Sequence, residues 1–124
     1  MERPLDDEVV ALIRGSIRSI WTLELLLLLR RHRGREWREA ELVRELRGSR
    51  AIVRNSLAEL AAANLADIQP DGTSRAGYGS AHDDAVDRLA LAYEQTPAAV
   101  IKAILAAPDD RIQTFADAFR WFKE

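Results

Sequence analysis

Apolar residues recur at helical spacing over most of the chain, and this pattern predicts a mainly helical protein. The apolar stripe of a first helix, over residues 5 to 14, consists of Leu5, Val9, Leu12 and Ile13. Gly15 and Ser16 interrupt that helix, and a second one starts at Ser16 or Ser19 and runs to about His32. Because its leucines at 25 to 29 cover every side of the cylinder, neighbours must cover it on more than one face. We therefore expect it to be the central helix.

Two further helices follow, separated by a tight turn. The first, from Glu39 to Arg47, stops at Gly48, and Ser49 can cap the next, from Arg50 to Ala63. The apolar stripe of that next helix is Val53, Leu57, Leu60 and Ala61. Asn64 stands where a residue with left-handed backbone would end it, a place at which asparagine substitutes for glycine.

After Asn64 the pattern changes to the alternation of a strand. Residues 65 to 69 alternate, the sequence PDGTS at 70 to 74 has turn chemistry, and residues 76 to 79 predict a short return strand with Tyr78 facing the core. Arg35 to Trp37 is long enough only for a loop or a strand of one bridge. From His82 the chain is helical again, with helices to about Tyr93, from Thr96 and Pro97 to Ala106, and from Pro108 to Lys123.

A helix, a short helix, a tight turn, another helix and a hairpin, in this order, are the layout of a winged helix. Residues 17 to 79 resemble the bacterial winged helix-turn-helix transcriptional regulators. The residues that carry the resemblance are Ser49, Ala51, Val53, Leu57, Leu60 and the pair Asn64-Leu65, with asparagine where that family usually has glycine. The expected fold is mainly α with a small β-hairpin: a winged helix-turn-helix over 16–80, an accessory helix over 1–15, and a helical extension over 81–124 in the same compact domain.

The resemblance implies which side chains face DNA. On the second helix of the turn they are Ser49, Arg50, Ile52, Arg54 and Asn55. Arginine can pair with the two acceptors of guanine and asparagine with adenine, whereas Ile52 can only touch a thymine methyl and Glu59 would repel phosphate. The hairpin would add Thr73, Ser74 and Arg75, and the loop after the central helix would add phosphate contacts, including Arg35 and Arg38. The alternative is that these arginines only cap helices and solvate the surface.

Charge is distributed unevenly along the chain. The net charge is −2, but Arg14 to Arg54 holds eleven arginines and five acids, a balance of +6, whereas residues 61 to 124 have a balance of −4. This asymmetry favours nucleic-acid contact on one side. The absence of cysteine, the acidic start and an apolar stretch of only 13 residues, Ile17 to Leu29, predict a cytoplasmic protein without membrane insertion.

Enzymatic chemistry finds little support in the sequence. His32 and His82 lack a catalytic partner at a recognisable spacing, and GYGS, residues 77 to 80, lacks the lysine of a phosphate-binding loop. His82 with Asp83, Asp84 and Asp87 imitates a metal cluster, but acids at a helix start are explained by the helix dipole. We expect no enzymatic activity, metal or cofactor.

The sequence thus predicts a transcriptional regulator that binds double-stranded DNA as a homodimer. The C-terminal helices would form the dimer or bind a regulatory protein. One rival is a winged-helix module that binds a protein and not DNA. Another is a small-molecule sensor with a pocket between the central and C-terminal helices, its wall formed by Trp21, Tyr93, Phe115 and Phe119.

Overall fold

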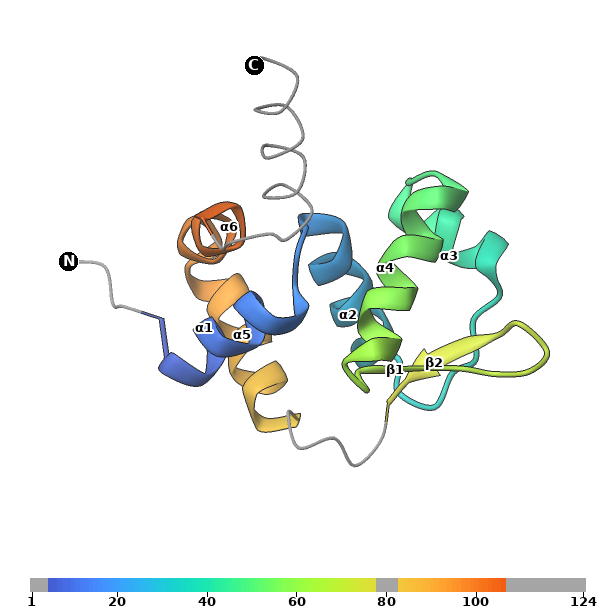
Figure 1. Ribbon diagram of the computed structural model, residues 1–124, viewed down its shortest axis with the longest axis horizontal. Coiled ribbons are helices and arrows are strands. Elements are labelled where there is room, and N and C mark those ends of the chain that lie inside the picture. The colour runs from blue at the N-terminus through green and yellow to red at the C-terminus, as the bar shows by residue number, and fades with distance from the viewer. Residues whose placement is uncertain (1–4, 78–82, 107–124) are drawn as a thin grey trace, which may run out of the picture.

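The computed structural model describes residues 5–77 and 83–106, which form helices and one small antiparallel sheet (Figure 1). In chain order the elements are α1 (Asp7–Ser16), α2 (Ile20–Arg31), α3 (Glu39–Leu46), α4 (Arg50–Ala62), β1 (Ala66–Ile68), β2 (Ser74–Ala76), α5 (Asp83–Gln95) and α6 (Pro97–Ala106). The expectation of a mainly helical chain with a small hairpin is confirmed.

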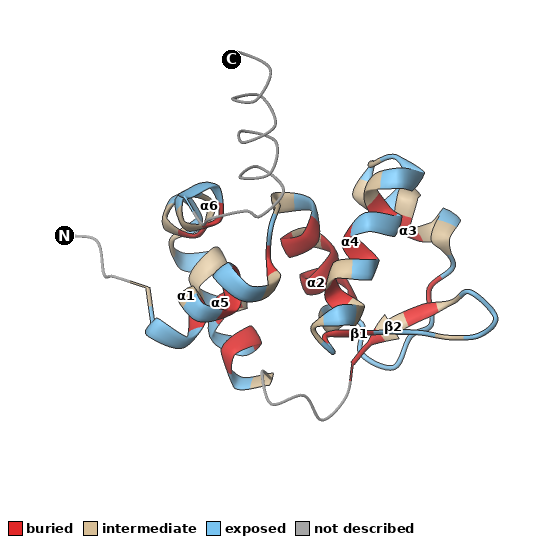
Figure 2. Cartoon of the chain, in the orientation of Figure 1, coloured by how far each residue is buried: buried red, intermediate tan, exposed pale blue. Residues whose placement is uncertain are grey.

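Helix α2 is the centre of the molecule. The side chains of Leu25 to Leu29 are all buried, as the all-round apolar pattern predicts. Helices α3 and α4 and strand β2 pack against α2, while α1, α5 and α6 pack on one another and lie on its other side (Figures 1 and 2). The central helix therefore joins two groups of elements, one that contains the hairpin and one that is only helical.

Helix α1 differs from the prediction at both ends. It begins after Asp6, whose carboxylate accepts a hydrogen bond of 2.8 Å from the backbone N–H of Glu8, and it includes Gly15 and Ser16. The cost of a glycine inside a helix, about 1 kcal/mol, is offset because the two additional helical residues bring Ile17 into the core, where it is fully buried. The prediction that Gly15 interrupts the helix is therefore wrong.

The hairpin pairs Ala66 with Ala76, Asp67 with Arg75 and Ile68 with Ser74. Its return strand begins two residues earlier than residues 76 to 79, because Ser74 belongs to the strand and not to the turn. Trp37 joins the same sheet as a single bridge: its N–H donates to the Ser74 carbonyl at 2.7 Å, and the Ser74 N–H donates to the Trp37 carbonyl at 2.8 Å. Of the two possibilities that the sequence leaves open for residues 35 to 37, a loop or a strand of one bridge, the structure has the bridge.

The last two described helices follow the sequence pattern closely. Pro97 is the first residue of α6, and Val86, Leu89, Val100 and Ile104 are buried where α1, α5 and α6 meet. The predicted position of Tyr78 and the predicted helix from Pro108 to Lys123 lie outside the described residues.

Candidate nucleic-acid interface

The turn between α3 and α4 is built by three consecutive residues. Arg47 has left-handed backbone (φ 56°), which ends α3, and the hydroxyl of Ser49 accepts a hydrogen bond of 3.1 Å from the backbone N–H of Ile52, which caps α4. Between them, Gly48 lies against the ring of Trp21, and a Cβ at this position would be only 3.1 Å from the ring. A side chain at this position would push the ring of Trp21, on α2, back by a few tenths of an ångström.

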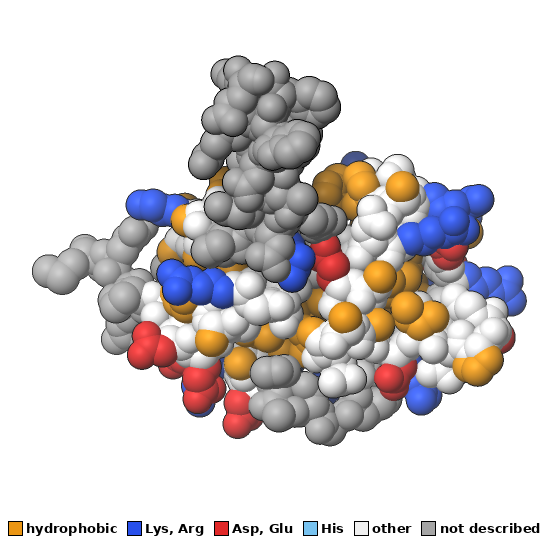
Figure 3. Space-filling model, in the orientation of Figure 1, with side chains coloured by type: hydrophobic (Ala, Val, Ile, Leu, Met, Phe, Trp, Pro, Cys, Tyr) orange, Lys and Arg blue, Asp and Glu red, His pale blue; other side chains and the backbone are white. Residues whose placement is uncertain are grey.

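Helix α4 has one buried and one exposed face. Val53, Leu57 and Leu60 are buried, as predicted from the sequence. On the opposite face the side chains of Arg50 and Arg54 are 70% and 64% exposed, and Asn55 is exposed. Ile52 is half-buried at the edge of this face, and Ser49 is exposed although its hydroxyl serves as the cap. Arginine side chains gather at the end of the molecule where α3 and α4 lie (Figure 3).

The carboxylate of Glu39 forms ion pairs with both exposed arginines of α4. Oε1 of Glu39, the first residue of α3, lies 3.2 Å from Nε of Arg50 and 3.0 Å from Nε of Arg54. The Glu39 side chain is 30% exposed, so it lies beneath the two guanidinium groups. Formally these three side chains carry a net charge of +1, concentrated at the N-terminal end of α4, where the helix dipole is also positive.

The expectation that Glu59 repels phosphate is not supported by its position. Glu59 is half-buried, and its Oε2 accepts a hydrogen bond of 2.8 Å from the hydroxyl of Thr22, which is completely buried on α2. The Thr22 hydroxyl is also 3.3 Å from Oγ of Ser56 and 3.1 Å from Oγ of Ser19. The carboxylate is therefore part of a polar contact between α2 and α4 rather than of the arginine-bearing face.

The hairpin offers fewer polar groups than the sequence suggests. Ser74 is 1% exposed, because its side chain faces the interior beside the Trp37 bridge, so its predicted contact with DNA is corrected. Asp71 accepts hydrogen bonds from the hydroxyl and the backbone N–H of Thr73, at 2.7 and 2.9 Å, and these bonds lower the pKa of Asp71. Arg75 is 36% exposed, and its Nε lies 3.7 Å from Asp67 on the paired strand. The hairpin is therefore polar, and the carboxylates of Asp67 and Asp71 offset the positive charge of Arg75.

Arg35 and Arg38 lie beside the start of α3. The guanidinium of Arg35 stacks 3.6 Å from the centre of the Trp37 ring and donates to Glu41 at 3.0 Å. The hydrogen bond from the backbone N–H of Arg38, at 2.8 Å, is the main reason that the pKa of Glu41 is low, and Arg35 adds to the effect. Arg38 itself is exposed, and its charge also helps to lower the pKa of Asp71 in the hairpin turn. Arg38 therefore lies between α3 and the hairpin.

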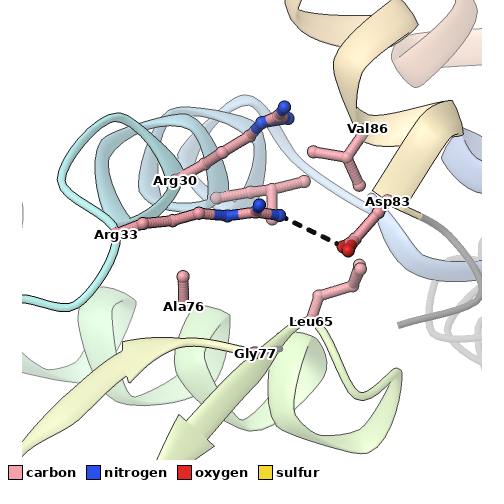
Figure 4. A pocket seen from close by; sticks show the side chains of 8 residues that line it. Arg30, Arg33, Leu65, Ala76, Gly77, Asp83 and Val86 are labelled. Carbon is pink, nitrogen blue, oxygen red and sulfur yellow. Dashed lines mark hydrogen bonds and ion pairs between the residues drawn. The ribbon is translucent and has the colours of Figure 1, made fainter. Parts of the chain in front are cut away.

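Arginines at the other end of the central helix are paired differently. Arg33 donates to Asp83 of α5 at 3.2 Å, and Arg30 forms an ion pair with Asp87, one turn further along α5. Figure 4 shows Arg33 reaching across to Asp83 over a small cavity, of about 10 Å³, that Leu65, Gly77 and Val86 also line. This cavity has room for about one water molecule and for no larger ligand.

The predicted sensor pocket is only partly assembled by the described residues. An open groove of about 500 Å³ between α2 and α5 is lined by Leu27, Arg30, Arg31, Ala90, Tyr93 and Glu94. Tyr93 is in this wall as expected, and its hydroxyl donates to Glu24 at 2.8 Å, which, with burial, raises the pKa of Tyr93. Trp21 packs on Gly48 instead, and Phe115 and Phe119 lie outside the described residues.

Within residues 5–77 and 83–106, no group of three His, Asp or Glu side chains could hold a metal ion. His82, the centre of the cluster weighed above, lies outside these ranges. Over the same part of the chain, none of the helices has both the length and the apolar character that crossing a bilayer requires.

Sequence reasoning missed Glu39 as part of the site. Its acidic character at a helix start suggests only a favourable dipole interaction, and its separation from Arg50 and Arg54 corresponds to no helical spacing. The contact arises from the way α3 packs on α4.

Comparisons with models of protein families, with curated protein sequences and with solved structures find no significant match for this chain.

Proposed function

We propose that this chain is a winged helix-turn-helix protein that binds double-stranded DNA and regulates transcription. In this proposal α4 enters the major groove with Arg50, Arg54 and Asn55 toward the bases, and the hairpin lies along the neighbouring backbone with Thr73 and Arg75. Arg38 and Arg35, on the side of α3, would contact phosphate. The observation that carries the proposal is the exposed pair of arginines at the start of α4, which share the carboxylate of Glu39 and form no other ion pair with the described residues.

Three further features support this reading. The exposed face of α4 also carries Ala51 and Ala58, whose small side chains allow the helix axis to approach a groove closely. Strand β1 follows directly from α4 and packs against it, and the Trp37 bridge ties the hairpin to the segment before α3. The recognition helix and the hairpin would therefore meet DNA as one rigid surface, which reduces the entropy cost of binding.

The proposal includes a homodimer in the cytoplasm. Regulators of this kind read two half-sites about one turn of DNA apart, and their two-fold symmetry mirrors that of the operator. Leu91 on α5 and Leu105 on α6 are 52% and 75% exposed, so this side has apolar surface for a second copy or for a regulatory protein. Sedimentation of the protein with and without duplex would give the number of chains in each state.

The test is the affinity for duplex DNA as a function of salt concentration. If phosphate contacts dominate, the logarithm of the association constant falls linearly with the logarithm of salt, by about 0.9 per neutralised phosphate. Four such contacts would give a slope of about −3.6. A duplex selected from random sequence should bind at least tenfold more tightly than a scrambled duplex of the same composition. No binding of either duplex at low salt would overturn the proposal.

A protein partner is the second candidate, because the hairpin also has features that suit one. Ile68 on β1 is 50% exposed, and Asp67 partly neutralises Arg75 on the facing strand. A partner that covers Ile68 would bind with little dependence on salt. The slope of affinity against salt therefore separates the two candidates.

A further inference from the structure

In both arginines of the α4 face, the same guanidinium nitrogen faces the carboxylate of Glu39. In both Arg50 and Arg54, the nitrogen nearest to Glu39 Oε1 is Nε, at 3.2 and 3.0 Å. A guanidinium has five N–H groups in a fixed plane, one on Nε and two on each terminal nitrogen. A contact through Nε leaves the edge formed by the two terminal nitrogens available for another partner.

That available edge is the one that guanine needs. Its O6 and N7 are two acceptors side by side, and they are best matched by two parallel N–H donors of one arginine. Without Glu39, each long side chain would sample many rotamers and would meet the nearest phosphate as readily as a base. With Glu39, the Nε ends of both guanidinium groups are attracted to one buried carboxylate oxygen, Oε1, which accepts no hydrogen bond from the described residues, so the attraction is electrostatic.

We propose that Glu39 determines specificity: it positions Arg50 and Arg54 for base edges, and its negative charge disfavours their contact with phosphate. This inference rests on the proposed DNA binding and deepens it, because it assigns to α3 a role in discrimination between duplexes. Glu39 is a positioning residue, since it acts through the arginines and does not itself need to touch DNA.

The same contact does little for the stability of the fold. Arg50 and Arg54 are 70% and 64% exposed, and ion pairs of exposed arginines contribute little because water screens them and side-chain entropy opposes them. Replacement of Glu39 by Gln keeps the shape of the side chain and removes its charge. Glu39→Gln should therefore leave the thermal midpoint nearly unchanged, which separates a positioning role from a structural one.

The matched control is Glu45→Gln. Glu45 is also on α3, is exposed and loses the same charge, but it forms none of the ion pairs found over the described residues. Both variants raise the net charge by one, so a general electrostatic effect on DNA affinity appears in both. An effect of position appears only in Glu39→Gln.

The experiment measures the affinity of the wild type and both variants for a duplex selected with the wild type and for a scrambled duplex. For Glu39→Gln we expect several-fold tighter binding of the scrambled duplex and a roughly tenfold lower ratio of selected to scrambled affinity, since part of a bidentate contact is lost. The slope against salt should steepen by about 0.9 for each arginine that turns to phosphate. Glu45→Gln should raise both affinities by one common factor.

Nitrogen-15 spectra of the protein without DNA provide an independent readout. The Nε resonances of Arg50 and Arg54, assigned with Arg→Lys variants, should shift in Glu39→Gln, because the negative charge 3.2 and 3.0 Å from these nitrogens is removed. Unchanged Nε resonances, or an unchanged ratio of affinities, would overturn the role of Glu39 while leaving DNA binding intact. If the wild type binds neither duplex, the proposed function itself fails, and with it this inference.

Discussion

The arginines near the end of α2 and those at the start of α4 differ in the number of carboxylates with which they pair. Arg30 and Arg33 each have their own acid on α5, Asp87 and Asp83, and Arg30 is only 20% exposed. Arg50 and Arg54 share one acid and are mostly exposed. The first group joins two helices of the fold, and the second retains positive charge at the surface.

This difference explains why a count of charges along the sequence overstates the cationic surface. Of the eleven arginines between Arg14 and Arg54, those that face α5 are neutralised within the fold. Burial makes the charged form of Arg30 less favourable and lowers its pKa, although Asp83 acts in the opposite direction. The function of an arginine in this protein thus depends on the number of acids around it, which the fold decides.

The largest expected effect tests the comparison directly. Replacement of Arg50 and Arg54 together by Ala should weaken binding of a selected duplex about 100-fold, since each bidentate contact discriminates by about 1–3 kcal/mol and about 1.4 kcal/mol is tenfold in affinity. Replacement of Arg30 and Arg33 together by Ala, which removes the same two charges from the α5 side, is the control and should change affinity less than about threefold. Fluorescence anisotropy of labelled duplex measures both. Equal losses in the two proteins would mean that the comparison is wrong.

A second test concerns the polar contact beneath α4. Thr22→Val should lower the free energy of unfolding by about 1–3 kcal/mol, because it leaves Glu59 and Ser56 without the hydroxyl of a fully buried residue. Urea unfolding measures the loss. Thr22→Ser keeps the hydroxyl and should cost less. A neutral effect of Thr22→Val would show that Glu59 has enough solvent to be satisfied without α2.

The pairs between α2 and α5 should contribute to stability in the order of their burial. Arg30→Ala should cost about 1 kcal/mol of unfolding free energy, and Arg33→Ala, at an exposed pair, only about 0.3 kcal/mol. Thermal unfolding of the two variants gives the order. The reverse order would indicate that the desolvation of Arg30 outweighs its attraction to Asp87.

The smallest effect is expected from Tyr93, which also joins α5 to α2. Its hydrogen bond to Glu24 raises its pKa in the folded state above the unfolded value of about 10. The stabilisation is therefore complete below about pH 10 and is lost as pH rises through the folded pKa. Ultraviolet titration of the wild type against Tyr93→Phe gives the midpoint. A midpoint at or below 10 would contradict the contact.

Local signals in the sequence were sufficient for most of the backbone. Ser49 caps α4, Asn64 takes the left-handed conformation with φ 61°, and Pro97 begins α6, because each of these depends on the residue and its immediate neighbours. Gly15 was misread because its local preference for breaking a helix is outweighed by the burial of Ile17, which only the packed structure reveals.

The pairing of side chains at the candidate site could not be predicted in this way. Glu39 reaches Arg50 and Arg54 across a helix packing contact, and Glu59 meets Thr22 across another. Ser74 is buried because Trp37, far from it in the sequence, pairs with its backbone. Such contacts depend on the relative placement of whole elements, so residue type and spacing are insufficient to find them.

The Trp37 bridge has a mechanical consequence for the candidate site. Two short backbone hydrogen bonds, of 2.7 and 2.8 Å, connect Ser74 in the hairpin to a residue only two positions before Glu39. The hairpin therefore cannot move away from the segment before α3 unless both of these bonds break, so the position of the hairpin also constrains where the Glu39 carboxylate lies.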